Sequence, residues 1–162
     1  MVSLGLELYN SIYDKDINLI RDLILKGADV NYLIWHTPLI LATMYDRPDV
    51  CSLLLESGAN VNLQNNTGNT ALMHVMGPNK RILKLLLEYD ADINLANKNN
   101  LNALTLYKNN EYKEYVEILE EHIEKKKLLI AKKRLALSKL FNSNLGENLL
   151  EEGLYEKISI LI

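Results

Sequence analysis

The sequence predicts an all-α solenoid in which short helix–turn–helix units stack on one another, followed by a helical C-terminal extension. Three observations predict it: two short motifs recur at a constant spacing, a leucine-rich stretch precedes each copy of one motif, and asparagine clusters separate the units. A single pair of short helices cannot bury its own apolar face, so units of this kind must stack.

Composition excludes several classes of protein. The 162 residues are 48% hydrophobic and 24% charged, which suits one globular unit with its own core. The net charge of −3 argues against a basic nucleic-acid-binding domain. Cys51 is the single cysteine, so neither an intramolecular disulfide nor a thiolate zinc cluster can form.

The chain shows neither a secretory signal nor an apolar run near the roughly 20 residues that span a bilayer. We therefore expect no membrane insertion. An intracellular, cytoplasmic location is favoured, and signal-less secretion into a host is the alternative.

The two motifs mark the end and the beginning of each unit. The first reads Gly-Ala-Asp-Val-Asn or a close variant, and its copies are residues 27–31, 58–62 and 90–94. The second is a Thr-Pro-Leu-like start, and its copies are residues 37–39, 70–72 and 102–104. Two ordered motifs that keep their spacing indicate a stacked array rather than a globule with long-range pairing.

The second unit shows why these residues form helices. Thr37 is suited to cap a helix N-terminus, and Pro38 sits in the first turn, where a missing N–H costs nothing. Pro48 opens a second helix, whose apolar residues recur at helical spacing. Gly58 supplies the left-handed residue that ends it.

These motifs resemble the ankyrin-repeat family, with its Thr-Pro-Leu-His helix start and Gly-Ala-Asp-Val-Asn exit. The resemblance implies an ankyrin-type array over 1–121, with an N-terminal cap repeat at 4–31, repeats at 32–62 and 63–94, and a degenerate repeat at 95–121. Residues 122–162 match no family and are interpreted as a helical C-terminal cap.

Some positions depart from the family pattern. The loop of the second unit is two residues short, and Trp35 stands where the family usually has glycine. Gly68 and Asn100 occupy the matching position in the next two units, and both tolerate positive φ. Asp90 replaces the glycine that ends a helix, and Tyr107 fills a position that is usually alanine.

The C-terminal region reads as helix over 111–141. Seven basic residues and no acidic one lie within 125–139, and apolar residues point in three directions around the helix. The favoured interpretation is a helix wedged between the repeats and a further helix at 147–162, after a turn at 142–146. A surface for a partner or for self-association is the alternative.

No constellation of residues predicts catalysis, so we expect a protein that is not an enzyme and holds no cofactor or metal. His74 is interpreted as a hydrogen-bonded residue on the first helix of its unit. His36 lies in a loop tip without a second metal ligand at suitable spacing. Cys51 lies on a buried helical stripe and is interpreted as an inert apolar residue.

The resemblance implies binding of a protein partner through a concave surface of finger loops and first helices. The positions carried over are Ile34, Trp35, His36, Met44, Tyr45, Asn66, Thr67, Asn69, Lys98, Asn99, Leu101, Asn109 and Asn110. Alternatives are an inhibitor, immunity or host-directed effector protein that blocks an enzyme, or a structural unit that self-associates through its C-terminal helices. A monomer is favoured over an assembly.

Trp35 is the strongest single candidate for a partner contact, because tryptophan and tyrosine are frequent interface anchors. The alternative interpretation is that Trp35 folds back over the first two units and fills the space left by the short loop.

Overall fold

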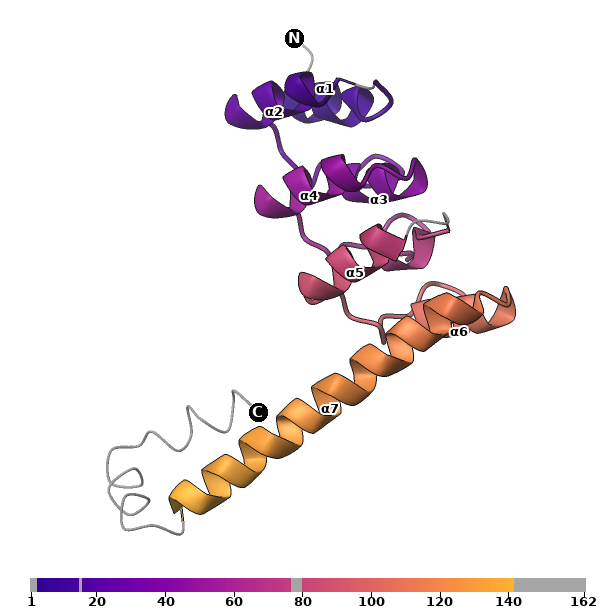
Figure 1. Ribbon diagram of the computed structural model, residues 1–162. Helices are drawn as coiled ribbons and strands as arrows, with labels where there is room; N and C mark the ends of the chain where they lie inside the picture. The colour runs from indigo at the N-terminus through magenta and orange to yellow at the C-terminus, as the bar shows by residue number, and fades with distance from the viewer. Residues whose placement is uncertain (1–2, 15, 77–79, 142–162) are drawn as a thin grey trace. The chain divides into compact units, whose positions relative to one another are not determined.

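The computed structural model describes residues 3–14, 16–76 and 80–141, and its regular secondary structure there is entirely helical. This confirms the all-α prediction. The chain divides into two compact units, residues 1–116 and 117–162. The elements are α1 (Leu4–Ser11), α2 (Ile17–Leu25), α3 (Pro38–Met44), α4 (Pro48–Glu56), the 3₁₀ turn η1 (Leu72–His74), α5 (Lys80–Glu88), α6 (Ala103–Asn109) and α7 (Lys113–Phe141) (Figure 1).

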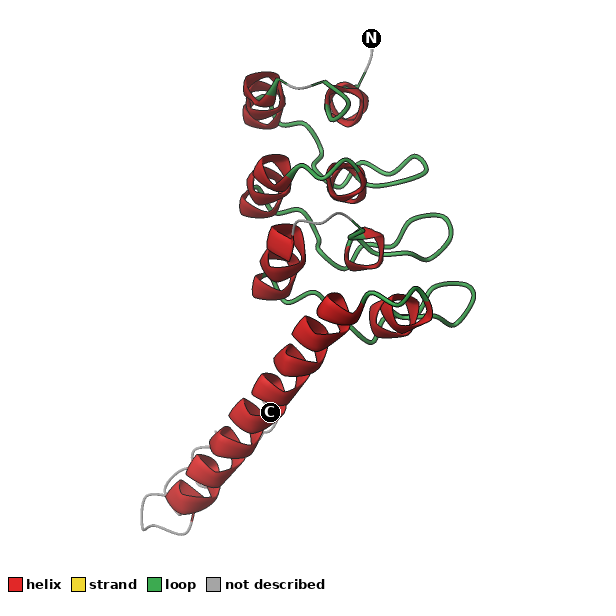
Figure 2. Cartoon of the chain, turned by 45° about the vertical axis from the view of Figure 1, so that its right-hand side comes forward, coloured by secondary structure: helices red, strands yellow, loops and turns green. Residues whose placement is uncertain are grey.

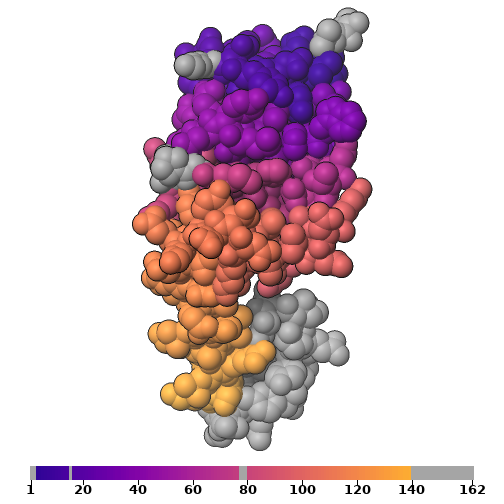
Figure 3. Space-filling view, turned by 90° about the vertical axis from the view of Figure 1, so that its right-hand side faces the viewer, coloured from indigo at the N-terminus to yellow at the C-terminus, as the bar shows by residue number. Residues whose placement is uncertain are grey.

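Within the first unit, helix pairs stack in chain order. Helices α2, α4 and α5 contact one another in succession, while α3 contacts η1 and η1 contacts α6. The loops that precede α3, η1 and α6 project beyond these elements on the side away from α4 and α5 (Figure 2). In the space-filling view, the repeats form successive bands from indigo to orange (Figure 3).

Local capping chemistry explains where the first helices begin. The Thr37 hydroxyl accepts a hydrogen bond from the Ile40 amide at 3.2 Å, as its motif predicts. Asn102 and Thr105 form a reciprocal capping box at the start of α6. The sequence therefore defines these two starts through contacts made within one turn.

The asparagine that closes each exit motif bridges consecutive repeats. The Asn31 side-chain oxygen accepts from the Asn60 amide at 2.7 Å, and Asn62 accepts from the Asp92 amide at 2.7 Å. The Asn62 side-chain amide also donates to the Asp90 carbonyl at 3.4 Å. The exit motif thus joins neighbouring repeats by hydrogen bonds, in addition to ending a helix.

The prediction of a first helix in the third unit is wrong in extent, because the structure has a single 3₁₀ turn there. The Met73 and His74 amides bond three residues back, and Val75 is already extended. In an α-helix the Leu72 carbonyl would accept an N–H four residues later. Here it accepts a hydrogen bond from the Tyr107 hydroxyl instead.

Several turns use left-handed backbone where the sequence predicted it. Asp90, which replaces a helix-ending glycine, has φ +59°, and Asn100 has φ +57°. Gly68 has φ +81°, and a Cβ there would lie 2.9 Å from the Lys98 backbone nitrogen. Trp35 has no positive φ, so the shortened loop avoids the conformation that favours glycine.

Helix α7 is one unbroken helix (Figure 1). Its apolar residues Leu128, Leu129, Ile130 and Leu135 are 39–57% exposed. The predicted turn at 142–146 and the helix at 147–162 lie outside the described residues, so the wedged-helix interpretation stays a prediction.

Candidate functional site

The loop before η1 is organised around the buried side chain of Asn65. Its amide oxygen accepts hydrogen bonds from the Thr67 amide at 2.9 Å, the Thr67 hydroxyl at 2.7 Å and the Asn69 amide at 2.9 Å. Three donors on one oxygen determine the orientation of the amide group. The Asn65 NH₂ group must therefore point the other way.

That NH₂ group lies between two histidines from neighbouring repeats. It is 3.0 Å from His36 Nδ1 and 3.4 Å from His74 Nε2, and the two rings meet edge to face at 5.6 Å. Because Asn65 donates, both facing nitrogens must be unprotonated acceptors. Burial, with a smaller contribution from His36, lowers the pKa of His74 to about 4.

Hydrogen bonds between neighbouring loops hold three loops in register. The Asn66 side chain donates to the Ile34 carbonyl at 3.0 Å, and the Lys98 amide donates to the Thr67 carbonyl at 3.1 Å. Between the same two loops as the Lys98–Thr67 bond, the Asn97 side chain donates to Asn69 Oδ1 at 2.7 Å. The polar groups of Asn66 and Asn69, which we predicted to face a partner, thus bind the adjacent loops.

Trp35 lies on this ordered loop with 69% of its surface exposed. The alternative interpretation, in which Trp35 folds back over the first repeats, is therefore wrong. Ile34 and His36 on either side are half-buried, and the Asn66 amide donates to the Trp35 carbonyl at 3.5 Å. Hydrogen bonds from the next repeat therefore hold the backbone that carries the exposed indole.

A second set of exposed apolar side chains lies at the ends of the first helices of the repeats. Met44 and Tyr45, both predicted, are 48% and 53% exposed at the end of α3. Tyr13 packs edge to face on Tyr45 at 5.3 Å, and Met76 is 61% exposed after η1. Tyr13 and Met76 were not predicted, although each lies about one repeat period from a predicted residue.

The predicted positions of the last repeat are mostly open. Lys98, Asn99, Asn109 and Asn110 are exposed, whereas Leu101 is half-buried. The Asn110 side chain donates to the Leu106 carbonyl at 2.7 Å and so closes the end of α6.

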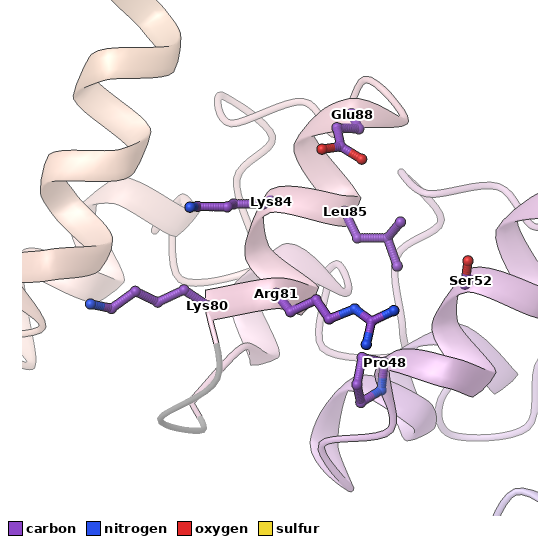
Figure 4. A pocket seen from close by; sticks show the side chains of 7 residues that line it. All are labelled: Pro48, Ser52, Lys80, Arg81, Lys84, Leu85 and Glu88. Atoms are coloured by element: carbon purple, nitrogen blue, oxygen red, sulfur yellow. The ribbon is translucent and has the colours of Figure 1, made fainter.

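A groove of about 490 Å³ is lined by residues of α4 and α5, the helices on the side away from the loops (Figure 2). Its lining residues are Pro48, Ser52, Lys80, Arg81, Lys84, Leu85 and Glu88. Arg81 extends toward Pro48 and Ser52 (Figure 4). Lys80 is ion-paired with Glu114. The lining is of mixed charge, with three basic side chains and one acidic side chain.

Cys51 lies in the core of α4, as its spacing predicts. It is fully buried, the Thr43 hydroxyl lies 3.8 Å from its sulfur, and burial raises the pKa of its thiol to about 12. Among the described residues there is no cluster of three or more metal-ligating side chains. In the same part of the chain, no helix combines the length and apolar character needed to cross a bilayer.

Stacked helical hairpins with projecting, mutually hydrogen-bonded loops define a helical repeat protein. The family described as "Ankyrin repeats (3 copies)" matches residues 8–97, which is more than half of the chain, and the chain belongs to this family. Ankyrin repeats are generally protein-interaction modules and typically non-enzymatic.

Curated relatives match only part of this chain. Arf-GAP with coiled-coil, ANK repeat and PH domain-containing protein 2 is 36% identical over 74 residues in both Homo sapiens and Oryctolagus cuniculus. The match covers 43% of this chain and 10% of each relative, so the chain spans about a tenth of their length. The Gallus gallus protein is 34% identical over 74 residues, with the same coverage.

Proposed function

We propose that this chain is a non-enzymatic interaction module that binds a protein partner through its loops and first-helix ends. The observation that carries the proposal is the exposure of Trp35 on a loop held in place by hydrogen bonds from the next repeat. Leaving an indole in water is costly, and burial against a partner recovers that free energy.

The ordering of the loops favours binding of this kind. Asn65 and Asn97 each hold one loop through several hydrogen bonds. A surface that is already ordered loses little conformational entropy when it binds. Met44, Tyr45 and Tyr13 add a second apolar area at the helix ends, and their thioether and phenol groups are typical of interfaces.

Affinity capture from the source cell, followed by titration of each purified candidate partner, tests the proposal. The variant Trp35→Ala/Tyr45→Ala should weaken binding by at least about tenfold, because truncated interface anchors commonly cost more than 1 kcal/mol each. Leu25→Ala is the matched control, since Leu25 is 80% exposed at the end of α2, a helix on the side away from the projecting loops (Figure 2).

Trp35 also reports binding directly, because it is the single tryptophan of the chain. Acrylamide should quench its fluorescence strongly in the free protein and weakly in the complex. Equal quenching in both states, or equal affinity of the double variant and the parent chain, would place the interface elsewhere. If the captured partner is an enzyme that equimolar addition silences, the module acts as an inhibitor.

A further inference from the structure

Helix α7 carries an exposed apolar face with opposite charges at its two ends. Leu128 and Leu135 are each 57% exposed, and Ala131 between them is also exposed. Glu124 lies one turn before Leu128, and Lys139 lies one turn after Leu135; both are exposed. At 100° per residue these five side chains fall within about 80° of the helix circumference.

We propose that two copies of this chain pair through this face, with their α7 helices antiparallel. When Leu128 lies opposite Leu135 of the second copy, the same register places Glu124 opposite Lys139 of that copy. The two-fold axis then passes beside Ala131, whose small side chain lets the helices approach closely. Each contact occurs twice, as in a closed two-fold dimer.

The charges of α7 favour a second copy of the chain as the partner, and they favour the antiparallel orientation of the two helices. A parallel pair would place Glu124 beside Glu124 and Lys139 beside Lys139, which repel each other. The sequence has no acidic residue between Glu124 and Glu147, so the basic segment has no carboxylate of its own between these two positions. The antiparallel copy places its Glu124 carboxylate beside Lys139 and covers Leu128 and Leu135.

The present partner of Glu124 does not oppose the pairing strongly. Lys127 donates to the Glu124 carboxylate at 2.8 Å, and both side chains are largely exposed. Ion pairs of this kind are screened by solvent and contribute little to stability. Glu124 can therefore exchange or share this partner at small cost.

The proposal goes beyond partner binding, because it uses none of the residues of the loop surface. It also replaces the sequence-based expectation of a monomer. A dimer would display two copies of the loop surface and would raise the apparent affinity for a bivalent target.

Sedimentation velocity of the full chain, from micromolar to submillimolar concentration, tests the pairing. The parent chain should shift from 18.5 kDa to twice that mass as concentration rises. Glu124→Lys and Lys139→Glu should each raise the dissociation constant by at least about tenfold, because each places like charges at both ends of the face. The double variant Glu124→Lys/Lys139→Glu should return it to within about threefold of the parent value.

The double variant is decisive because its two residues lie about 22 Å apart along α7 and cannot meet within one helix. Lys133→Glu is the matched control: it makes the same charge change about 120° around the helix and should leave the dissociation constant within about threefold. Circular dichroism checks that α7 stays helical in every variant.

Cysteine cross-linking tests the register. Oxidation should join Leu128→Cys/Leu135→Cys chains into covalent dimers far faster than chains with Leu128→Cys alone. A parent chain that stays monomeric at the highest concentration overturns the proposal. Failure of the double charge reversal to restore dimers, or equal weakening by Lys133→Glu and Lys139→Glu, also overturns it.

Discussion

The Tyr107 hydroxyl donates a hydrogen bond to the backbone carbonyl of Leu72, a residue of the preceding repeat. Tyr107 is almost fully buried, and burial raises the pKa of its phenol, so the group is a neutral donor. The bond links α6 to η1 and occupies a carbonyl that an α-helix would use internally.

Tyr107→Phe should lower the free energy of unfolding by about 1–2 kcal/mol, because it leaves a buried carbonyl without its donor. Urea denaturation measures the change. Tyr89→Phe removes the hydroxyl of a tyrosine that is 38% exposed and should change stability by less than about 0.5 kcal/mol. Equal stability of Tyr107→Phe and the parent chain would mean that this hydrogen bond contributes nothing.

Alanine substitution should affect two glycines of similar backbone conformation differently. Gly58 and Gly68 have φ of +88° and +81°, but only Gly68 lies against backbone, 2.9 Å from the Lys98 nitrogen. Gly58→Ala should cost about 1 kcal/mol from backbone strain. Gly68→Ala should cost at least about 2 kcal/mol, because strain and a steric clash add. Thermal unfolding of both variants compares the costs, and a larger loss in Gly58→Ala would contradict this account.

The bridging role of the exit-motif asparagine predicts a contrast between Asn62 and Asn94. Asn62→Ala removes hydrogen bonds to Asp92 and Asp90 of the next repeat and should cost about 1–2 kcal/mol in chemical denaturation. Asn94 ends the same motif, and among the described residues its side chain makes no such bond. Asn94→Ala should therefore cost less than about 0.5 kcal/mol. Similar losses in the two variants would argue against the bridge.

The pair of histidines around Asn65 predicts that stability falls in mild acid. The pKa of His74 is about 4 in the folded chain and near its ordinary value of 6.5 when unfolded. Between these values the unfolded chain binds more protons, so stability falls as pH falls through this window and levels off below pH 4. The loss should be about 1–2 kcal/mol, since the half-buried ring keeps some contact with solvent.

Urea denaturation at several pH values between 7 and 4 measures this dependence, with His74→Gln as the control. The glutamine variant should lose the part of the slope due to His74, because its amide does not titrate. Nuclear magnetic resonance titration of His74 gives its pKa directly. A value near 6.5 would show that the ring is solvated.

Much of the fold could be predicted because its signals are short-range. The Thr37 cap, the glycine at the end of α4 and the spacing of its leucines act within a few residues, so the sequence displays them. The third repeat could not be predicted in the same way, because the Leu72 carbonyl of η1 accepts its hydrogen bond from Tyr107, which lies one repeat later in the chain.

The candidate site could likewise be predicted from the sequence only in part. The exposure of Tyr45 and Met44 follows from their place at a helix end. Tyr13 was not predicted because the first repeat lacks the start motif. For Trp35, the sequence left open whether the side chain contacts a partner or folds back over the first two units. Exposure of a loop side chain depends on neighbouring loops, which sequence spacing does not describe.

The repeating helical pairs and most of their starts and ends were determined by the sequence, since local backbone preference and periodicity decide them; the first helix of the third repeat is the exception. Stacking alone decided which polar side chains serve the fold and which surfaces stay open. Asn65 meets His36 only when two repeats pack, and a hydrogen bond between repeats forms only between groups that folding has brought together.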